Sequence, residues 1–232
     1  MLHDRNARLV TAIDRLDGDR PFHVRLCDTA VEVVDVTDAA LILMSDREVG
    51  TVVAASGPGV TRIEDLQFAL GEGPCLEAYH AGTPILEGDL RGVGAARWPM
   101  FTAAALAVGA EAVFGVPLVV GAIRCGVLYL CRGRPGALTD EQLADAIALA
   151  AIGTTTVLDL HSAAAVAVLG ATVDGVWHHR AVVHQATGMV SVQLGASLAE
   201  ALARIRATAF ASDRSIYDVA VDVVAGRERF QQ

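Results

Sequence analysis

The sequence predicts an α+β protein whose last part is an all-α module. Four apolar runs of strand length alternate with helical segments in the front of the chain: residues 39–44, 51–55, 111–119 and 123–131. After residue 176 the apolar positions recur only at three- and four-residue spacing, which is typical of amphipathic helices. We therefore expect a sheet flanked by helices, then a helical connector, and then three short helices.

The first predicted elements are two helices and a hairpin. Residues 1–17 have amphipathic spacing and predict an N-terminal helical extension that packs on a neighbour. A second helix follows from Phe22. The strand runs 39–44 and 51–55 are separated by a short polar turn, so they predict an antiparallel hairpin.

Four pairs of residues have the capping-box pattern, in which Ser or Thr precedes an acidic or amide residue by three positions. The pairs are Thr61 with Glu64, Thr139 with Gln142, Ser197 with Glu200, and Ser215 with Asp218. In such a box each side chain accepts a hydrogen bond from the other residue's backbone N–H. The pattern predicts a helix start at each pair.

The second of these pairs opens a long predicted helix from Asp140 through Leu160. Its positions at alternating four- and three-residue steps are those of a coiled-coil seam: Leu143, Ile147, Ala150, Thr154, Val157, His161, Ala164 and Val168. Ala, Thr and His are weak seam residues, and Gly153 lowers helix stability by about 1 kcal/mol. We still expect a helical connector through which two copies of the chain associate.

The helix predicted after residue 176 has two different sides. Its apolar stripe consists of Val182, Val183, Ala186, Met189, Val190 and Leu194. The other side carries Arg180, His184, Thr187 and Ser191. A mixed Arg and His face with almost no catalytic residue types favours a module that binds a polymer.

This last part of the chain resembles the ANTAR domain, an RNA-binding module of bacterial transcription antiterminators. The resemblance covers residues 178–224, through the run RAVVHQATGMVSVQLGASLAEALARIRATAF and the later RSIYDVA. It rests on matches in order: Arg180, Gln185, Ala186, Gly188, Met189, Arg206, Ala209, Arg214 and residues 218–220. It implies a dimer that binds structured RNA, a pair of stem-loops, and so prevents transcription termination.

The candidate RNA-binding residues come from the polar side of the first helix and from the arginines that follow: Arg180, His184, Thr187, Gly188, Ser191, Arg206 and Arg214. Arginine pairs with phosphates and stacks on unpaired bases. Thr187 stands where many ANTAR domains have lysine, which removes one charge from the expected surface. We interpret Gly188 first as a position that allows close helix packing. Arg204 is expected to pair with Glu200, four residues earlier.

The motifs upstream follow the order of a GAF domain, and the resemblance covers residues 22–160. They are LGEGPCLEA at residues 70–78, TPI at 83–85, RWPMF at 97–101, and VPL and GVL within the last two strand runs. The resemblance implies a small-molecule-sensing α+β fold with a mainly antiparallel central sheet. It does not name the signal.

Five residues of this region are candidate ligand contacts: Asp89, Trp98, Met100, Phe101 and Glu111. The first and last supply a polar contact, and the other three supply an apolar lining. Aromatic residues after a loop also fit a place in the core, and that alternative stays open. No resident cofactor is expected besides the unknown small ligand.

The four cysteines, Cys27, Cys75, Cys125 and Cys131, form no Cys-x-x-Cys pair, so we expect buried reduced thiols. The two-residue period of a strand places Cys125 and Cys131 on one face. Seven histidines without paired spacing do not indicate a metal site. We expect no enzyme; the enzymatic alternative is a thiol-dependent reductase, because free methionine sulfoxide reductases resemble GAF domains.

Composition favours a globular protein in the cytoplasm. Hydrophobic residues make up 53% of the chain, and no apolar stretch reaches the ~18 residues of a membrane span. The start lacks a secretory signature, so no membrane contact is expected. Residues 174–232 hold six acidic residues and six arginines, so the whole net charge of −9 lies in residues 1–173. A neutral terminal module also fits a second alternative, in which its helices bind a protein partner.

The sequence thus predicts four segments: an N-terminal helical extension at residues 1–21, a GAF-like sensor domain at 22–160, a helical connector at 161–173 and an ANTAR-like module at 174–232. We expect a signal-responsive RNA-binding transcription antitermination regulator. It would act as a homodimer and sense an unknown small molecule.

Overall fold

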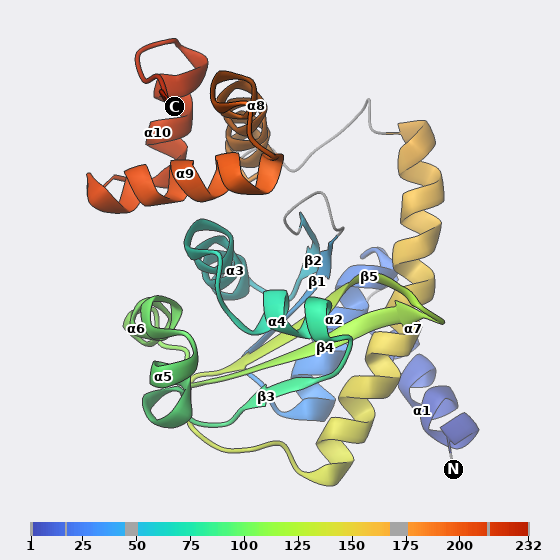
Figure 1. The fold of residues 1–232 in the computed structure, drawn as a ribbon. Helices are drawn as coiled ribbons and strands as arrows, with labels where there is room; N and C mark the ends of the chain where they lie inside the picture. The colour runs from blue at the N-terminus through green and yellow to red at the C-terminus, as the bar shows by residue number, and fades with distance from the viewer. Residues whose placement is uncertain (1, 17, 45–50, 168–175, 213, 232) are drawn as a thin grey trace. The chain divides into compact units, whose positions relative to one another are not determined.

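The computed structural model describes all residues except 1, 17, 45–50, 168–175, 213 and 232 (Figure 1). The chain divides into two compact units, Met1–Val166 and Ala167–Gln232, and each is described by itself. The predicted turn between the first two strands and the seam position Val168 lie outside the described residues.

A five-stranded antiparallel sheet forms the centre of the first unit (Figure 1). The strands are β1 (Asp38–Leu43), β2 (Thr51–Ala55), β3 (Ile85–Glu87), β4 (Ala112–Val120) and β5 (Ile123–Arg132). Their order is β2-β1-β5-β4-β3, and each neighbouring pair is antiparallel. The predicted α+β class and the hairpin of β1 and β2 are confirmed.

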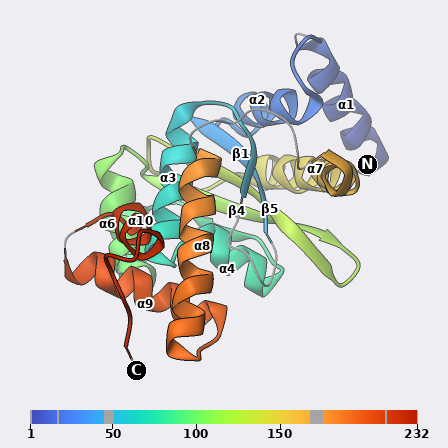
Figure 2. The ribbon, with the colours of Figure 1, turned by 90° about the horizontal axis from the view of Figure 1, so that it is seen from above.

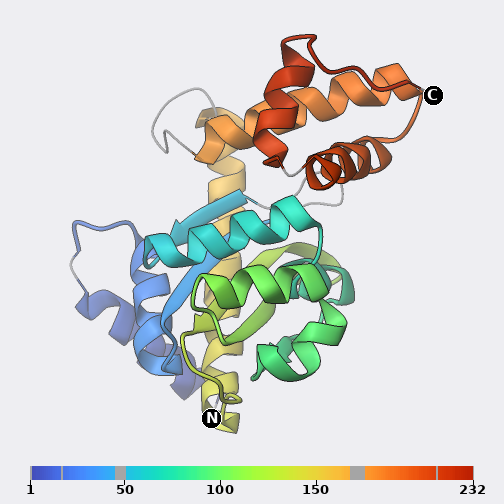
Figure 3. The ribbon, with the colours of Figure 1, turned by 90° about the vertical axis from the view of Figure 1, so that its left-hand side faces the viewer.

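Helices cover both faces of this sheet (Figures 2 and 3). One face packs against α1 (Leu2–Arg15), α2 (Phe22–Val34) and α7 (Asp140–Ala167). The other packs against α3 (Pro58–Leu70), α4 (Pro74–Ala81) and α6 (Pro99–Ala107). Two short pieces, η1 (Leu90–Gly94) and α5 (Ala95–Arg97), connect β3 to α6.

Successive strand residues belong to different cores because side chains alternate between the faces of a sheet. Leu41 and Leu128 pack with the first group of helices, and we call this side the α7 face. Ile42 and Tyr129 pack with the second group, and we call that side the α4 face.

A bulge in β5 interrupts this alternation. Leu118 of β4 pairs with Gly126, but the next residue of β4, Val119, pairs with Arg124, so Cys125 is an extra residue in β5. Cys125 consequently belongs to the core of the α7 face, whereas Cys131 belongs to that of the α4 face. The expectation that these two cysteines share a strand face is wrong. The extra residue breaks the two-residue alternation, so positions on either side of the bulge no longer keep the same relation to the two faces.

Helix α3 begins earlier than the sequence pattern predicts. It starts at Pro58 with Gly57 as its N-cap, so Thr61 lies inside the helix and does not cap it. A Cβ on Gly57 or on Gly59 would lie 2.8 Å from a carboxylate oxygen of Asp38. Glycine therefore lets the Asp38 carboxyl lie against the first turn of α3, where burial raises the pKa of that carboxyl.

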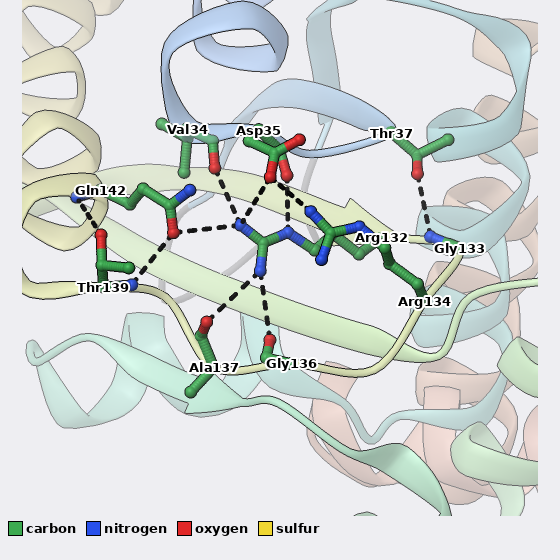
Figure 4. Close-up of polar contacts among 10 residues, drawn as sticks. All are labelled: Val34, Asp35, Thr37, Arg132, Gly133, Arg134, Gly136, Ala137, Thr139 and Gln142. Atoms are coloured by element: carbon green, nitrogen blue, oxygen red, sulfur yellow. Dashed lines mark hydrogen bonds and ion pairs between the residues drawn. The ribbon is translucent and has the colours of Figure 1, made fainter.

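One buried arginine at the end of β5 holds the start of α7 (Figure 4). The Arg132 guanidinium donates to the carbonyl oxygens of Val34 (3.0 Å) and Asp35 (2.6 Å) and to Gln142 Oε1 (3.2 Å). It also donates to two carbonyl oxygens of the loop between β5 and α7. Gln142 also accepts the Thr139 N–H at 3.0 Å, and Thr139 Oγ1 accepts the Gln142 N–H at 3.2 Å. The predicted capping box is thus confirmed.

The side of α7 that faces the sheet contains part of the predicted seam. A Cβ on Gly153 would lie 2.9 Å from Leu41 Cδ2, so glycine allows α7 to approach β1 closely. Ala150 and Thr154 are buried within the unit, whereas Ile147 is 46% exposed. The described seam positions therefore do not form one outward stripe, because the helix packs on the sheet through its small residues.

Helix α1 is part of the packing of the first unit. Its Leu9 and Ile13 are fully buried in the core of the α7 face. Arg5 and Arg8 both pair with the buried carboxylate of Asp145 on α7, the latter at 2.7 Å. The neighbour on which this predicted helix packs is thus the rest of the first unit.

Three helices form the described part of the second unit beyond residue 175: α8 (Val176–Leu194), α9 (Leu198–Ala211) and α10 (Ile216–Val224). Each packs on the other two, and their buried apolar residues are Val183, Ala186, Val190, Ala201, Leu202, Ile205, Ala209, Val219, Ala220 and Val223. The prediction of three helices is confirmed. Among the helices in the described ranges, none is long and apolar enough to cross a membrane.

The two predicted caps of this unit differ. At α9 the box is complete: Ser197 Oγ accepts the Glu200 N–H, and the Glu200 carboxylate accepts the Ser197 N–H at 2.9 Å. At α10, Ser215 Oγ accepts the Asp218 N–H at 3.0 Å, but the Asp218 carboxylate accepts the serine hydroxyl at 2.7 Å. The second box therefore has the hydrogen bond from the Asp218 backbone to Ser215, and the Asp218 carboxylate binds the serine side chain in place of its backbone N–H.

Candidate ligand site and candidate RNA interface

The two aromatic ligand candidates lie in the core of the α4 face. Trp98 is 4% exposed and Phe101 is fully buried, and their rings meet edge to face with centroids 6.0 Å apart. The Trp98 indole N–H donates to Glu77 at 3.0 Å. The structure thus gives both rings the core position that the sequence leaves open as an alternative.

Two glutamates of the LGEGPCLEA motif, which the sequence did not single out as site residues, position this segment. Glu72 accepts the backbone N–H groups of Met100 and Phe101, each at 2.7 Å, and so satisfies the first turn of α6. Glu77 accepts from Nε of Arg97 at 2.8 Å and also from its NH2 group, and this pairing lowers the pKa of the Glu77 carboxyl. The side chain of Met100 remains 39% exposed.

The acidic ligand candidates belong to a network near the surface. Asp89 is exposed, and its carboxylate accepts the backbone N–H of Arg91 at 3.0 Å. The Arg91 guanidinium pairs with Glu111 at 3.0 Å. Arg91, which the sequence did not single out, therefore links the two predicted polar contacts.

Five residues with polar side-chain atoms are buried among the elements of the α4 face: Gln67, Cys75, Thr102, Tyr129 and Cys131. Gln67 donates to Cys75 Sγ at 3.1 Å and accepts the Cys75 N–H at 2.8 Å. The hydroxyls of Thr102 and Tyr129 are buried without a hydrogen-bond partner among the described residues. No motif in the sequence marks these hydroxyls.

The two buried thiols of the α4 face are poor nucleophiles. Burial raises the pKa of the Cys131 thiol to about 12, and it raises that of Cys75 further. A thiol must lose its proton before it attacks, so both are held in the unreactive form near neutral pH.

Helix α8 divides the predicted RNA residues between its surface and its core. His184 is exposed, and Ser191 is half-buried with its hydroxyl donating to the Ala196 carbonyl at 2.6 Å. Arg180 lies in α8, but its side chain is outside the described set.

Thr187 does not share the outward side of α8. It is buried on the side that carries the core residues, and its hydroxyl donates to the carbonyl of Val183 at 2.7 Å. The expectation that it extends the polar face is wrong, because its angular position lies at the border of that face and the packed helices close over it.

Gly188 has a different role from the one predicted. A Cβ at this position would have nothing within 4 Å, so no close helix packing requires the glycine. The expectation of a packing role is wrong. The backbone of α8 is consequently open at this point.

The arginines of α9 and of the turn that follows it have distinct surroundings. Burial lowers the pKa of Arg206 to about 10. Arg214 pairs with Asp222 and donates to a backbone carbonyl of α10 at 3.1 Å, so its guanidinium ties the α9–α10 turn to α10. Arg204 is exposed, and no ion pair joins it to Glu200 in this described segment, because the Glu200 carboxylate serves the cap of α9.

The comparisons with known proteins agree with both resemblances. The family model of the GAF domain matches residues 24–159, and that of the ANTAR domain matches residues 177–224. No curated protein matches the chain.

Solved structures support the fold of the first unit. The GAF domain of an Acinetobacter phosphoenolpyruvate-protein phosphotransferase superposes with a TM-score of 0.53 at 14% identity, over 70% of this chain and 96% of that one. The GAF domain of a Coxiella burnetii phosphoenolpyruvate-protein phosphotransferase gives a TM-score of 0.51 at 12% identity, over 71% and 96%. At these identities the likeness shows the fold alone.

A GAF domain implies a small-molecule ligand, and an ANTAR domain implies RNA binding. Together they support a regulatory RNA-binding signalling protein. The chain belongs to the GAF domain family, and its GAF domain is followed by an ANTAR domain.

Proposed function

We propose that the chain is a signal-responsive regulator that binds structured RNA, a pair of stem-loops, and so prevents transcription termination. The observation that carries this proposal is the order of the two matched domains on one chain. A small ligand in the GAF domain supplies the signal. The protein acts in the cytoplasm as a homodimer and has no catalytic activity.

The proposed RNA surface is the outward side of α8. His184 and Gln185 are exposed there, and Gly188 leaves the helix backbone open. Glycine inside a helix costs roughly 0.5–1 kcal/mol relative to alanine, and no packing contact at this position offsets that cost. Close approach of an RNA strand to the helix gives the glycine a function.

The proposed ligand site lies on the α4 face of the sheet. Tyr129 and Thr102 present buried hydroxyls there without a partner among the described residues, and a small ligand with polar groups would satisfy them. Trp98 and Phe101 would then support the site as part of its packed wall.

The RNA surface is tested by a change that preserves the helix. Gly188→Glu adds bulk and negative charge at an open position, and glutamate is a better helix former than glycine. We expect copurifying stem-loop RNA to fall roughly tenfold or more while the melting temperature is kept or raised. Gly18→Glu is the matched control, because a Cβ on Gly18 also has nothing within 4 Å. Equal RNA recovery from both variants would remove α8 from the interface.

Two observations bear on the alternatives. The equal numbers of acidic residues and arginines in residues 174–232 suit a protein partner as well as RNA. The salt dependence of binding separates the two, because phosphate contacts weaken steeply with salt.

The raised pKa values of Cys75 and Cys131 oppose the thiol-dependent reductase, since that chemistry needs a thiolate.

A further inference from the structure

We infer that Phe210 on α9 is a stacking platform for an unpaired RNA base. This inference rests on the proposed RNA binding and adds a contact on a second helix. The Phe210 side chain is 71% exposed, and it is the only aromatic residue among the large apolar side chains that the described part of the chain exposes. By contrast, Phe101 and Phe114 are fully buried.

The neighbours of Phe210 along α9 are small side chains and one partly buried arginine. Ala203, Ala207 and Ala211 are exposed, so small side chains surround the ring on its helix. Arg206 precedes Phe210 by one turn, and a helical side chain leans toward the preceding turn, so the ring lies over the part of α9 that carries this arginine. From Ala201 to Ser212 the sequence contains two arginines and no acidic residue.

This combination fits a nucleotide better than an apolar protein surface. Every base has a π-face that stacks on an aromatic ring, and neighbouring arginines neutralise the phosphates. A protein partner would require more apolar area than a ring among alanines supplies. RNA recognition also acts mainly on unpaired bases in loops, which a protruding ring reaches without opening a helix.

The test compares variants that differ only in the ring. The probe is a labelled hairpin RNA selected by the full-length chain from a pool of stem-loops with randomised loops. We expect Phe210→Leu, which keeps an apolar side chain, to weaken binding roughly 5- to 150-fold, the range for loss of one stacked base. Phe210→Tyr should bind within about twofold of the unchanged chain, since its ring still stacks.

A salt series and a control residue complete the experiment. Loss of stacking should leave the salt dependence of binding unchanged, whereas loss of a phosphate contact reduces its slope by about one. Leu198→Ala removes another exposed apolar side chain of α9, 51% exposed, and should bind RNA normally. Circular dichroism confirms that each variant keeps its helices.

The outcomes separate this inference from the proposed function. If the unchanged chain selects no hairpin, RNA binding itself fails. If it selects one and Phe210→Leu binds it equally well, only the stacking role is overturned. An unchanged RNA affinity together with a shifted oligomeric state in Phe210→Leu would assign the ring to a protein contact and overturn the inference as well.

Discussion

The two faces of the central sheet differ in whether their buried polar groups have hydrogen-bond or ion-pair partners. On the α7 face the buried charges are matched: Arg132 donates to backbone and amide oxygens, and Asp145 pairs with two arginines. On the α4 face the hydroxyls of Tyr129 and Thr102 have no partner within the described residues. Near the α7 face Asn6 Oδ1 and Arg25 Nε also have no partner among the described residues, but Asn6 is partly exposed and another nitrogen of Arg25 donates to the Ile13 carbonyl at 2.9 Å.

This difference indicates that the two faces of the sheet have different roles within one domain. The matched face anchors the start of α7, the long helix that precedes the second unit in the chain. The unmatched face keeps hydrogen-bonding capacity inside a core, which costs stability unless a ligand uses it. Removal of a matched polar group on the first face should therefore lower stability, whereas removal of either unpartnered hydroxyl on the second should change stability little.

The largest expected effect comes from Arg132. Arg132→Met leaves the carbonyl oxygens of Val34 and Asp35 and the amide oxygen of Gln142 without their donor. Each unsatisfied acceptor costs about 1–3 kcal/mol, so we expect a loss of about 3–5 kcal/mol in the free energy of unfolding. Urea unfolding followed by circular dichroism measures it. Arg134→Met is the control, because Arg134 pairs with Asp35 at the surface and should cost less than about 1 kcal/mol. Equal losses would deny the anchoring role.

The next effect is steric. Gly153→Val places methyl groups against Leu41 where α7 crosses the sheet, and we expect a loss of about 1–3 kcal/mol from overpacking. Ala151→Val puts the same side chain on the exposed side of the same helix and accounts for the helix propensity of valine. A smaller loss at residue 153 than at residue 151 would show that α7 does not approach β1 closely.

Alkaline pH should lower the free energy of unfolding through a buried thiol on each face. Burial raises the pKa of Cys27, on the α7 face, and of Cys131, on the α4 face, to about 12. An unfolded thiol loses its proton near pH ~8.5, so above that pH the folded state keeps a proton that the unfolded state releases. Stability is complete below about pH 8.5 and falls by up to about 1.4 kcal/mol per pH unit and thiol as the pH rises toward 12.

This dependence is checked by urea unfolding at several pH values between about 8 and 10. Cys27→Ala and Cys131→Ala should each remove one share of the slope. A slope that neither substitution changes would show that these thiols do not control it.

The smallest expected effect is at Tyr129. Tyr129→Phe removes a hydroxyl that has no partner among the described residues, so the free energy of unfolding should stay the same or rise by up to about 1 kcal/mol. Thr102→Val tests the second hydroxyl in the same way. A loss above about 1.5 kcal/mol in purified protein would show that the hydroxyl already has a partner, and the contrast between the two faces would then fail.

Much of the fold follows from local sequence patterns. The apolar runs predicted β1, β2, β4 and β5 with limits close to those observed, and Thr139 and Ser197 marked true helix starts. These signals are local, because strand alternation and capping involve residues only a few positions apart. Thr61 does not mark the helix start because α3 already begins at Pro58, where Gly57 and Gly59 leave room for Asp38 from a distant part of the sequence.

The candidate sites were less predictable than the fold. Helical periodicity located the polar side of α8 but assigned Thr187 to it, because a residue at the border of a face is buried or exposed according to the helices that pack there. The unpartnered hydroxyl of Tyr129 and the exposed ring of Phe210 carry no sequence signal, since tyrosine and phenylalanine occur in most cores.

The sequence by itself determined the two domains, the order of their elements and the kinds of partner that their families imply, because these depend on periodicity and on motifs in order. Only the tertiary structure decided which side of each element meets a neighbour. The bulge at Cys125, the burial of Thr187 and the anchoring of α7 by Arg132 all depend on atoms brought together from distant parts of the chain. Burial and hydrogen bonding are properties of that assembled packing, and no single segment contains them.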